Sequence, residues 1–185
     1  MAVMDDVRTT HPRRYLPAAF GVVFAGLNIV GLAEGADLAP LLAASGFVYL
    51  GAAALRRPGA AWPMFWLTFV VIGISKVAGG PDSVWVLLGL AALFAVYGLV
   101  RGAAHDREGL PRQAVAMAVV GAAAAVTLVV GGDLGGYLVA AGLLGHAGWD
   151  AYHHRTGKVV TRSMTEFCFV LDTLVAIAMV VVIVM

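Results

Sequence analysis

Long apolar stretches separated by short polar breaks run along the chain after residue 15. A bilayer core about 30 Å thick needs about 20 mostly apolar residues per helix, with about 17 as the lower limit. Seven stretches come close to this length: 16–32, 38–55, 61–77, 84–100, 114–130, 134–149 (extending toward 153) and 163–185. The pattern predicts an all-α membrane protein with a segment over 1–15 and a single seven-helix transmembrane domain over 16–185.

The breaks between these stretches are short and rich in Gly, Pro and Asp, as at 34–37, 57–59, 79–82 and 131–133. Such residues end helices and form tight turns, so consecutive helices are expected to pack as antiparallel neighbours. Four acidic residues occupy alternate breaks: Glu34, Asp37, Asp82 and Asp133. We interpret them as turn residues that cap the next helix, in preference to a mouth that attracts cations.

Positive charge is confined to the other set of alternate breaks. Cytoplasmic loops of membrane proteins retain Lys and Arg, so this pattern predicts orientation. It indicates a multi-pass protein of a bacterial plasma membrane, with segment 1–15 in the cytoplasm and Met185 outside. Eleven of the twelve basic residues follow the pattern and only Lys76 does not: Arg8, Arg13, Arg14, Arg56, Arg57, Arg101, Arg107, Arg112, Arg155, Lys158 and Arg162.

Composition supports the lipid bilayer as the main partner. The chain is 61% hydrophobic and 12% charged, with a mean hydropathy of +0.91, whereas a soluble domain has about 25% charged residues. A net charge of +1 gives no basis for nucleic-acid binding. The single cysteine, Cys168, excludes an internal disulfide. Small residues at 51–54 and 121–125 let helices approach closely, which favours either a compact bundle or a homo-oligomer.

An internal repeat is a further hypothesis. Placing Asp37 over Asp133 aligns 37–46 with 133–142, and with four extra loop residues 64–70 aligns with 164–170. The first three helices would then repeat as the last three, with the fourth as a linker. Because both halves begin on the same side, they would be parallel repeats related about the membrane normal, as in SWEET-type sugar carriers. A polar centre would be expected between the halves.

Candidate chemistry gathers in the last two predicted helices. His146, Asp150 and His153 are spaced i, i+4, i+7 and so share one helical face. On the following helix, Asp172 should lie roughly 14 Å below the helix start at Ser163, at a depth similar to that of His146. Ionisable groups this deep in a membrane usually face a protein interior or a water-filled cavity and indicate function. Glu166 points elsewhere and is a weaker candidate.

Three interpretations follow from this constellation. In the leading one, His146, Asp150 and His153 bind a divalent metal such as zinc, and Asp172 and His146 act as catalytic residues on a lipid-like substrate. In the second, the same groups serve a carrier of small solutes, cations or protons. In the third, His146 and Asp172 form a hydrogen-bonded pair that only holds two helices together. The sequence leaves open whether the protein is an enzyme.

The stretch from Gly145 to Asp172 resembles an uncharacterised family of small bacterial integral membrane proteins. The resemblance rests on the pattern His146-x-x-Trp149-Asp150-x-x-His153-His154, with Gly157, Cys168 and Asp172 after it. It covers about the last forty residues and implies that these residues occur together, without implying an activity.

Three other membrane protein classes share features with the chain but differ at decisive residues. Alkaline-ceramidase-like hydrolases also have seven helices and a His/Asp zinc site, yet this chain has no histidine between His11 and His105. The last predicted helix lacks a lysine for a retinal Schiff base, which argues against a rhodopsin, and the Pro-Gln pair of SWEET-type carriers is missing. The sequence contains no Gly-rich phosphate-binding loop, so it does not indicate that a nucleotide binds.

Overall fold

The computed structural model describes residues 15–30, 32, 38–79, 81–106 and 109–185, and all regular structure in these ranges is helical. The acidic residues Glu34 and Asp37, like segment 1–14, lie outside the described residues. Seven α-helices occur at the predicted positions, with ends that differ by at most four residues from the predictions except at the end of the sixth helix. They are α1 (Leu16–Ile29), α2 (Ala39–Ala54), α3 (Ala61–Ala78), α4 (Ser83–Val100), α5 (Leu110–Val130), α6 (Gly132–Thr156) and α7 (Arg162–Val184).

Local sequence explains where the helices begin and end. A proline stands in the first turn of α1, α2 and α5, where a missing N–H costs nothing. The Asp82 carboxylate accepts a hydrogen bond from the Val84 backbone N–H and caps α4, as predicted. Asp133 instead lies in the first turn of α6. At the other ends, Gly79 and Gly157 adopt the left-handed conformation that terminates α3 and α6.

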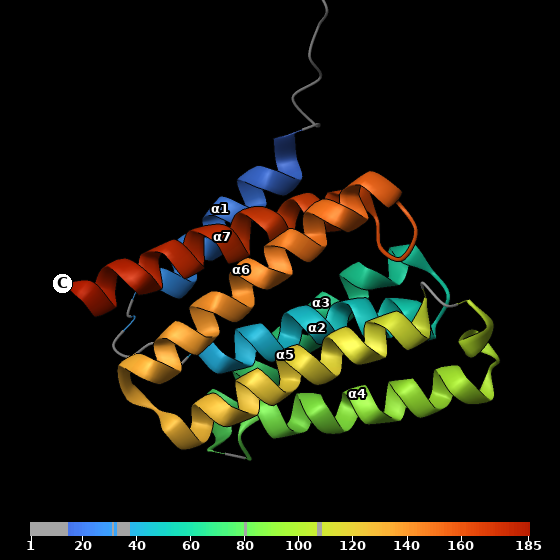
Figure 1. The fold of residues 1–185 in the computed structure, drawn as a ribbon, viewed down its shortest axis with the longest axis horizontal. Helices are drawn as coiled ribbons and strands as arrows, with labels where there is room; N and C mark the ends of the chain where they lie inside the picture. Colours follow the sequence, from blue (N-terminus) through green and yellow to red (C-terminus); the bar gives the residue numbers. More distant parts are fainter. Residues whose placement is uncertain (1–14, 31, 33–37, 80, 107–108) are drawn as a thin grey trace, which may run out of the picture.

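Helix α2 forms the centre of the bundle. Fourteen of its sixteen residues are buried, and it packs against α3, α4, α5 and α6, while α7 packs against α6 and α1 (Figure 1). Small residues permit this packing, as predicted. A Cβ atom at Gly46 of α2 would lie 2.5 Å from Val120 of α5, and one at Gly21 of α1 would lie 2.7 Å from the Phe167 carbonyl oxygen of α7.

Four of the helices are long and apolar enough to cross a membrane: α3 together with the short 3-10 helix before it, α4, α5 and α7. The seven-span prediction is thus supported only in part. Helices α1 and α2 have 14 and 16 residues, which corresponds to about 21 and 24 Å at 1.5 Å per residue. Helix α6 has 25 residues, but its second half carries the histidines and Asp150, which lower its hydropathy.

The outer surface of the bundle is apolar over much of its length. Large aliphatic side chains point outward, for example Leu93 of α4 at 66% exposure and Val115 of α5 at 67%. A water-soluble protein rarely exposes such extensive apolar surface, whereas a lipid environment accommodates it. Together with the four apolar helices, this surface fits a membrane protein.

The connections alternate between the two ends of the bundle. Figure 1 shows the α2–α3, α4–α5 and α6–α7 connections at one end, and the α3–α4 and α5–α6 turns with the C-terminus at the other. The first set of connections and the helix turns next to them contain seven of the described basic residues: Arg56, Arg57, Arg101, Arg112, Arg155, Lys158 and Arg162. The folded chain therefore gathers most of its positive charge at one end, which we call the basic end.

The helix contacts do not reproduce the symmetry that the internal repeat requires. In such a repeat α1 and α2 correspond to α5 and α6, so the extensive contact of α2 with α5 should have a counterpart between α6 and α1. No comparable contact exists there, and α1 packs against α7 whereas the corresponding pair, α5 and α3, does not. The residues shared by the two halves are small and apolar, so they reflect helices of similar composition.

Candidate functional site

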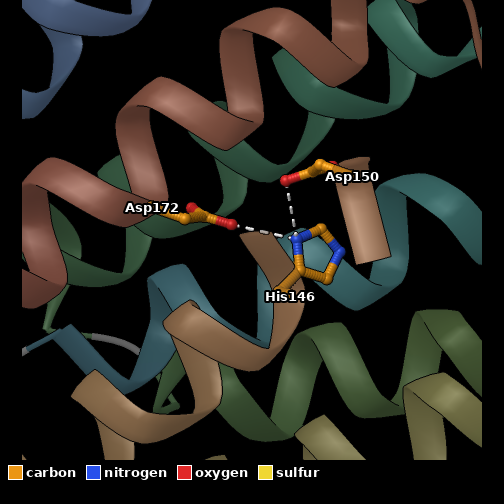
Figure 2. A group of neighbouring side chains, drawn as sticks. All are labelled: His146, Asp150 and Asp172. Carbon is orange, nitrogen blue, oxygen red and sulfur yellow. Dashed lines mark hydrogen bonds and ion pairs between the residues drawn. The ribbon is translucent and has the colours of Figure 1, made fainter. Parts of the chain in front are cut away.

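His146, Asp150 and Asp172 form a compact group in the middle of the bundle, which we call the His/Asp cluster. The His146 Nδ1 atom lies 2.9 Å from an Asp172 carboxylate oxygen and 3.4 Å from an Asp150 carboxylate oxygen (Figure 2). All three side chains are buried, with exposures of 4% or less. The i, i+4 spacing on α6 brings His146 and Asp150 together, and the antiparallel α7 supplies Asp172 at the same depth.

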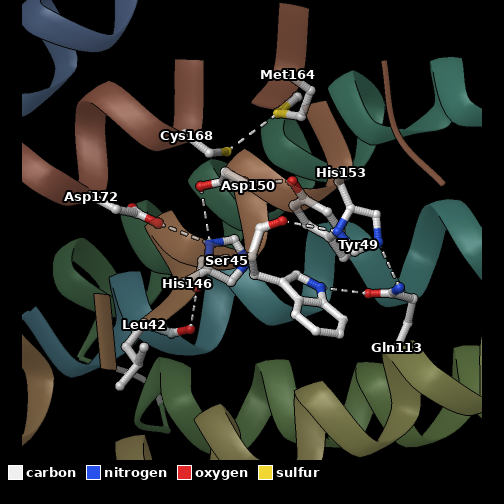
Figure 3. Close-up of polar contacts among 11 residues, drawn as sticks. Leu42, Ser45, Tyr49, Gln113, His146, Asp150, His153, Met164, Cys168 and Asp172 are labelled. Atoms are coloured by element: carbon white, nitrogen blue, oxygen red, sulfur yellow. Dashed lines mark hydrogen bonds and ion pairs between the residues drawn. The ribbon is translucent and has the colours of Figure 1, made fainter. Parts of the chain in front are cut away.

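The hydrogen bonds of the cluster leave one ring nitrogen free. His146 Nδ1 donates to Asp172, and the Tyr49 hydroxyl of α2 donates to the other Asp150 oxygen at 2.5 Å (Figure 3). His146 Nε2 is buried and has no hydrogen-bond partner among the described residues. Buried polar atoms are nearly always satisfied, so an unpartnered imidazole nitrogen here calls for a ligand or water.

The sequence predicts His153 as a metal ligand together with His146 and Asp150, but in the structure His153 lies outside the His/Asp cluster. Its Nδ1 lies 3.0 Å from the Trp149 carbonyl oxygen, and its Nε2 lies 3.1 Å from the Gln113 amide nitrogen. The carbonyl can only accept, so Nδ1 carries the proton and Nε2 accepts from the amide. The Gln113 oxygen in turn accepts from the Trp149 indole N–H at 3.1 Å. We call this set of three the Gln113 network.

Tyr49 explains physically why the shared face of α6 holds two separate sites. Its ring lies edge-on to the rings of His146 and His153, with centroid distances of 5.1 and 5.0 Å. Two helical turns separate the two histidines along α6, and the phenol from α2 fills the space beside both (Figure 3). The pattern of positions on α6 could not reveal a side chain from another helix.

The remaining candidates lie toward the basic end. The partly exposed His154 makes a 3.0 Å hydrogen bond to the Thr165 hydroxyl and lies 3.9 Å from Glu166. Glu166 stays outside the His/Asp cluster, in agreement with its weaker ranking. Tyr152 accepts a hydrogen bond from Arg112, whose guanidinium also stacks on the Trp149 ring.

Two buried polar residues of the site, Tyr49 and Gln113, were not among the predicted site residues. Tyr49 is a phenol among the apolar residues of α2, and Gln113 is an uncharged amide at 1% exposure near the start of α5. Each carried a usable signal, since a phenol or amide inside an apolar helix must find a partner when it is buried. The predicted span at 114 began one residue too late to include Gln113.

Three cavities each touch one member of the His/Asp cluster. A cavity of about 590 Å³ between α2, α5 and α6 has Tyr49, Gln113 and His146 in its wall and is otherwise mostly apolar. A second, of about 280 Å³, touches Asp150, and a third, of about 90 Å³, touches Asp172. Each member of the cluster thus lines a different cavity.

The donor set of the cluster matches a divalent cation. One ligand atom from each of the three residues lies within 4.8 Å of the others, and imidazole with carboxylate is a common set for zinc, manganese or iron. No Lys or Arg in the described part of the chain pairs with either carboxylate. Two buried carboxylates and a single imidazole therefore need further positive charge, from a bound cation or from protons.

Comparisons with protein-family models, with curated protein sequences and with solved structures give no match.

Proposed function

We propose that the chain is a multi-pass protein of a bacterial plasma membrane with the basic end in the cytoplasm. All seven helices cross the bilayer in this arrangement, with α2 held inside the bundle and the polar half of α6 covered by α2, α5 and α7. The gathering of basic residues at one end supports this orientation. A reporter that is active only outside the cytoplasm, fused at Met185, should be active. An inactive fusion, with an active fusion in the α4–α5 connection, would contradict it.

Within this bundle, the chain acts as a metal-dependent enzyme on a lipid-like substrate. The observation that carries this proposal is the convergence of His146, Asp150 and Asp172, with the His146 Nδ1 atom facing both carboxylates. A divalent cation there would balance the two buried carboxylates, which is the condition for keeping them ionised in an apolar interior. The ligands are then His146, Asp150 and Asp172, with Tyr49 fixing Asp150 through its hydroxyl.

The apolar cavity beside His146 supports the substrate class. Its wall includes Val115, Val119 and Ala123 of α5 and Ala141 and Gly142 of α6. Val115 and Val119 are both about two-thirds exposed on the outer surface, so the cavity adjoins the lipid-facing side of the bundle. An acyl chain can enter such a site laterally from the bilayer, with its head near the cluster.

A bound divalent cation would supply a water that loses its proton near neutral pH, suited to hydrolysis of an ester or amide. The protein residues have simpler tasks. Without the cation, the 2.9 Å contact between His146 Nδ1 and Asp172 holds a proton, which a cation bound by these two residues would replace. The apolar wall limits bulk water at the cluster.

Metal analysis of the purified full-length protein tests the proposal. Wild type should contain about one transition metal ion per chain, and His146→Ala and Asp150→Ala should each lose it, since a three-ligand site rarely holds a metal with two ligands. His154→Ala is the matched control, because this partly exposed histidine lies outside the cluster. Wild-type protein without stoichiometric metal would rule out a metal-dependent enzyme.

A carrier of protons or small cations is the second candidate, favoured by the cavities on either side of the cluster. The cavity at Asp150 also touches His154 and Glu166 near the basic end, and the cavity at Asp172 extends past Asn28. In proteoliposomes, such a carrier would show proton or solute flux that Asp172→Asn reduces. Flux that survives this substitution unchanged would contradict the carrier.

A further inference from the structure

Arg56 has an unusual backbone conformation at the end of α2. Its φ is +53°, and Arg56 is the only non-glycine residue with a positive φ in the described ranges. The Arg56 N–H bonds to the Ala53 carbonyl at 3.0 Å and the Arg57 N–H to the Ala52 carbonyl at 3.2 Å, which is the Schellman arrangement that ends many helices. Glycine normally takes this left-handed position, as Gly157 does after α6.

The turn brings two arginines to a surface cavity at the basic end. The cavity has a volume of about 620 Å³, and Arg56 and Arg57 line it together with Arg101 from the end of α4. Tyr97 adds a phenol, and no acidic side chain among the described residues lines the cavity. Arg56, Arg57 and Arg101 also form no salt bridge within the described part of the chain. Three guanidinium groups therefore line one cavity whose described wall holds no carboxylate. Asp106 lines a separate, neighbouring cavity with Arg56 and Arg57.

Membrane topology accounts for the presence of these arginines but not for this arrangement. Any loop position would satisfy the positive-inside rule, and glycine at position 56 would remove the backbone strain. Strained non-glycine residues persist where the surrounding structure or a function requires their side chain. The connection between α6 and α7 illustrates the alternative, because it has Lys158 in the loop and Arg155 and Arg162 in the adjoining helix turns, and it places glycine at the left-handed position.

We propose that Arg56, Arg57 and Arg101 form a binding site for a phosphate group. Guanidinium groups bind phosphate oxygens in pairs through charge-assisted hydrogen bonds, and three of them match a doubly charged or bridging phosphate. The phosphate belongs either to the headgroup of a lipid in the adjacent leaflet or to a soluble phosphate compound. This site shares no residue with the His/Asp cluster and does not depend on the activity proposed for it.

Binding measurements on the full-length protein distinguish the two sources. In neutral phosphatidylcholine nanodiscs, one arm replaces a fraction of the lipid with phosphatidylglycerol and counts retained anionic lipids by native mass spectrometry. The other arm titrates inorganic pyrophosphate and follows thermal unfolding. The double variant Arg57→Ala/Arg101→Ala should weaken binding at least about tenfold in the arm that shows binding to wild type. Added salt should weaken this binding further.

The double variant Arg155→Ala/Arg162→Ala is the matched control, since it removes the same charge from the facing ends of α6 and α7 at the basic end. It should bind like wild type. A response in the lipid arm alone assigns the site to a lipid headgroup, and a response in the pyrophosphate arm assigns it to a soluble phosphate. No response in either arm, or an equal loss in the control variant, would overturn the proposal.

Arg56→Gly separates binding from stability. Glycine relieves the left-handed strain, so this variant should unfold at the same or a higher temperature than wild type while binding the anion more weakly. Arg56→Lys keeps the charge and should retain part of the binding. Full binding by both Arg56→Gly and the Arg57/Arg101 double variant would show that the three arginines do not form the site.

Discussion

His146 and His153 lie on the same face of α6, both buried, yet their surroundings differ in kind. Both ring nitrogens of His153 are bonded to uncharged groups, the Trp149 carbonyl and the Gln113 amide. His146 faces two carboxylates through one nitrogen and has no partner for the other. One histidine completes a neutral network and the other forms part of an incompletely satisfied, charged group.

This difference shows how to distinguish a structural from a functional polar group in a membrane interior. A saturated network such as that of Gln113 ties helices together and leaves no atom for a ligand. The His/Asp cluster leaves a nitrogen and a charge unbalanced, and each of its members lines a cavity. Burial and identity of a histidine are therefore less informative than a full account of its hydrogen bonds.

The largest expected effect separates the two histidines by metal content. His146→Ala should reduce bound metal to background, a loss of more than about 100-fold in affinity, because an imidazole ligand is removed from a three-residue site. His153→Ala should leave the metal content of the folded protein unchanged. Elemental analysis of both variants, purified in parallel, measures the difference. Equal loss in the two variants would place both histidines in one site.

The next effect concerns stability. Gln113→Leu leaves the Trp149 N–H and His153 Nε2 without partners, so it should lower the free energy of unfolding by about 1–3 kcal/mol. Metal content should not change. Denaturant unfolding in detergent micelles measures the loss, with Val115→Ala on the exposed face of the same helix as the control. A stability loss no larger than that of the control would show that the network is dispensable.

Removing the Tyr49 hydroxyl should have a smaller effect on metal affinity. This residue packs against both histidines, so the variant tests the boundary between the two regions. Tyr49→Phe keeps the ring between the histidines but leaves an Asp150 oxygen without its donor, so metal affinity should fall by about tenfold. Titration of the metal-free protein measures this change. Tyr152→Phe is the control, because its hydroxyl bonds only to Arg112 among the described residues. If Tyr152→Phe weakened metal binding as much, the effect would not be specific to the cluster.

The smallest effect is expected at Glu166. Its carboxylate lies 3.9 Å from His154, and both side chains are more than a third exposed. Such pairs contribute about 0–1 kcal/mol, so Glu166→Gln should change neither metal content nor unfolding beyond measurement error. A loss of bound metal in this variant would extend the metal centre to the cavity beside Asp150.

The sequence predicted the helices and their ends well, and it predicted the contacts between helices poorly. Apolar runs and the proline, glycine and aspartate punctuation predicted seven helices with nearly correct ends, because these signals act within a few residues. The i, i+4 spacing likewise placed His146 beside Asp150, and helix rise placed Asp172 at the depth of His146. Similar residues in the two halves also suggested an internal repeat, which the helix contacts do not support. Composition alone does not determine which helix faces pack together.

The sequence by itself determined the helical fold, the apolar exterior, the alternation of basic breaks and a set of four candidate residues that includes the His/Asp cluster and His153. Only the tertiary structure decided which histidine joins that cluster. The deciding atoms come from α2 and α5, where Tyr49 separates the two imidazoles and Gln113 saturates His153. Helical periodicity specifies the neighbours along one helix, whereas the groups that complete a buried hydrogen-bond network come from helices about 40 to 100 residues away in the chain.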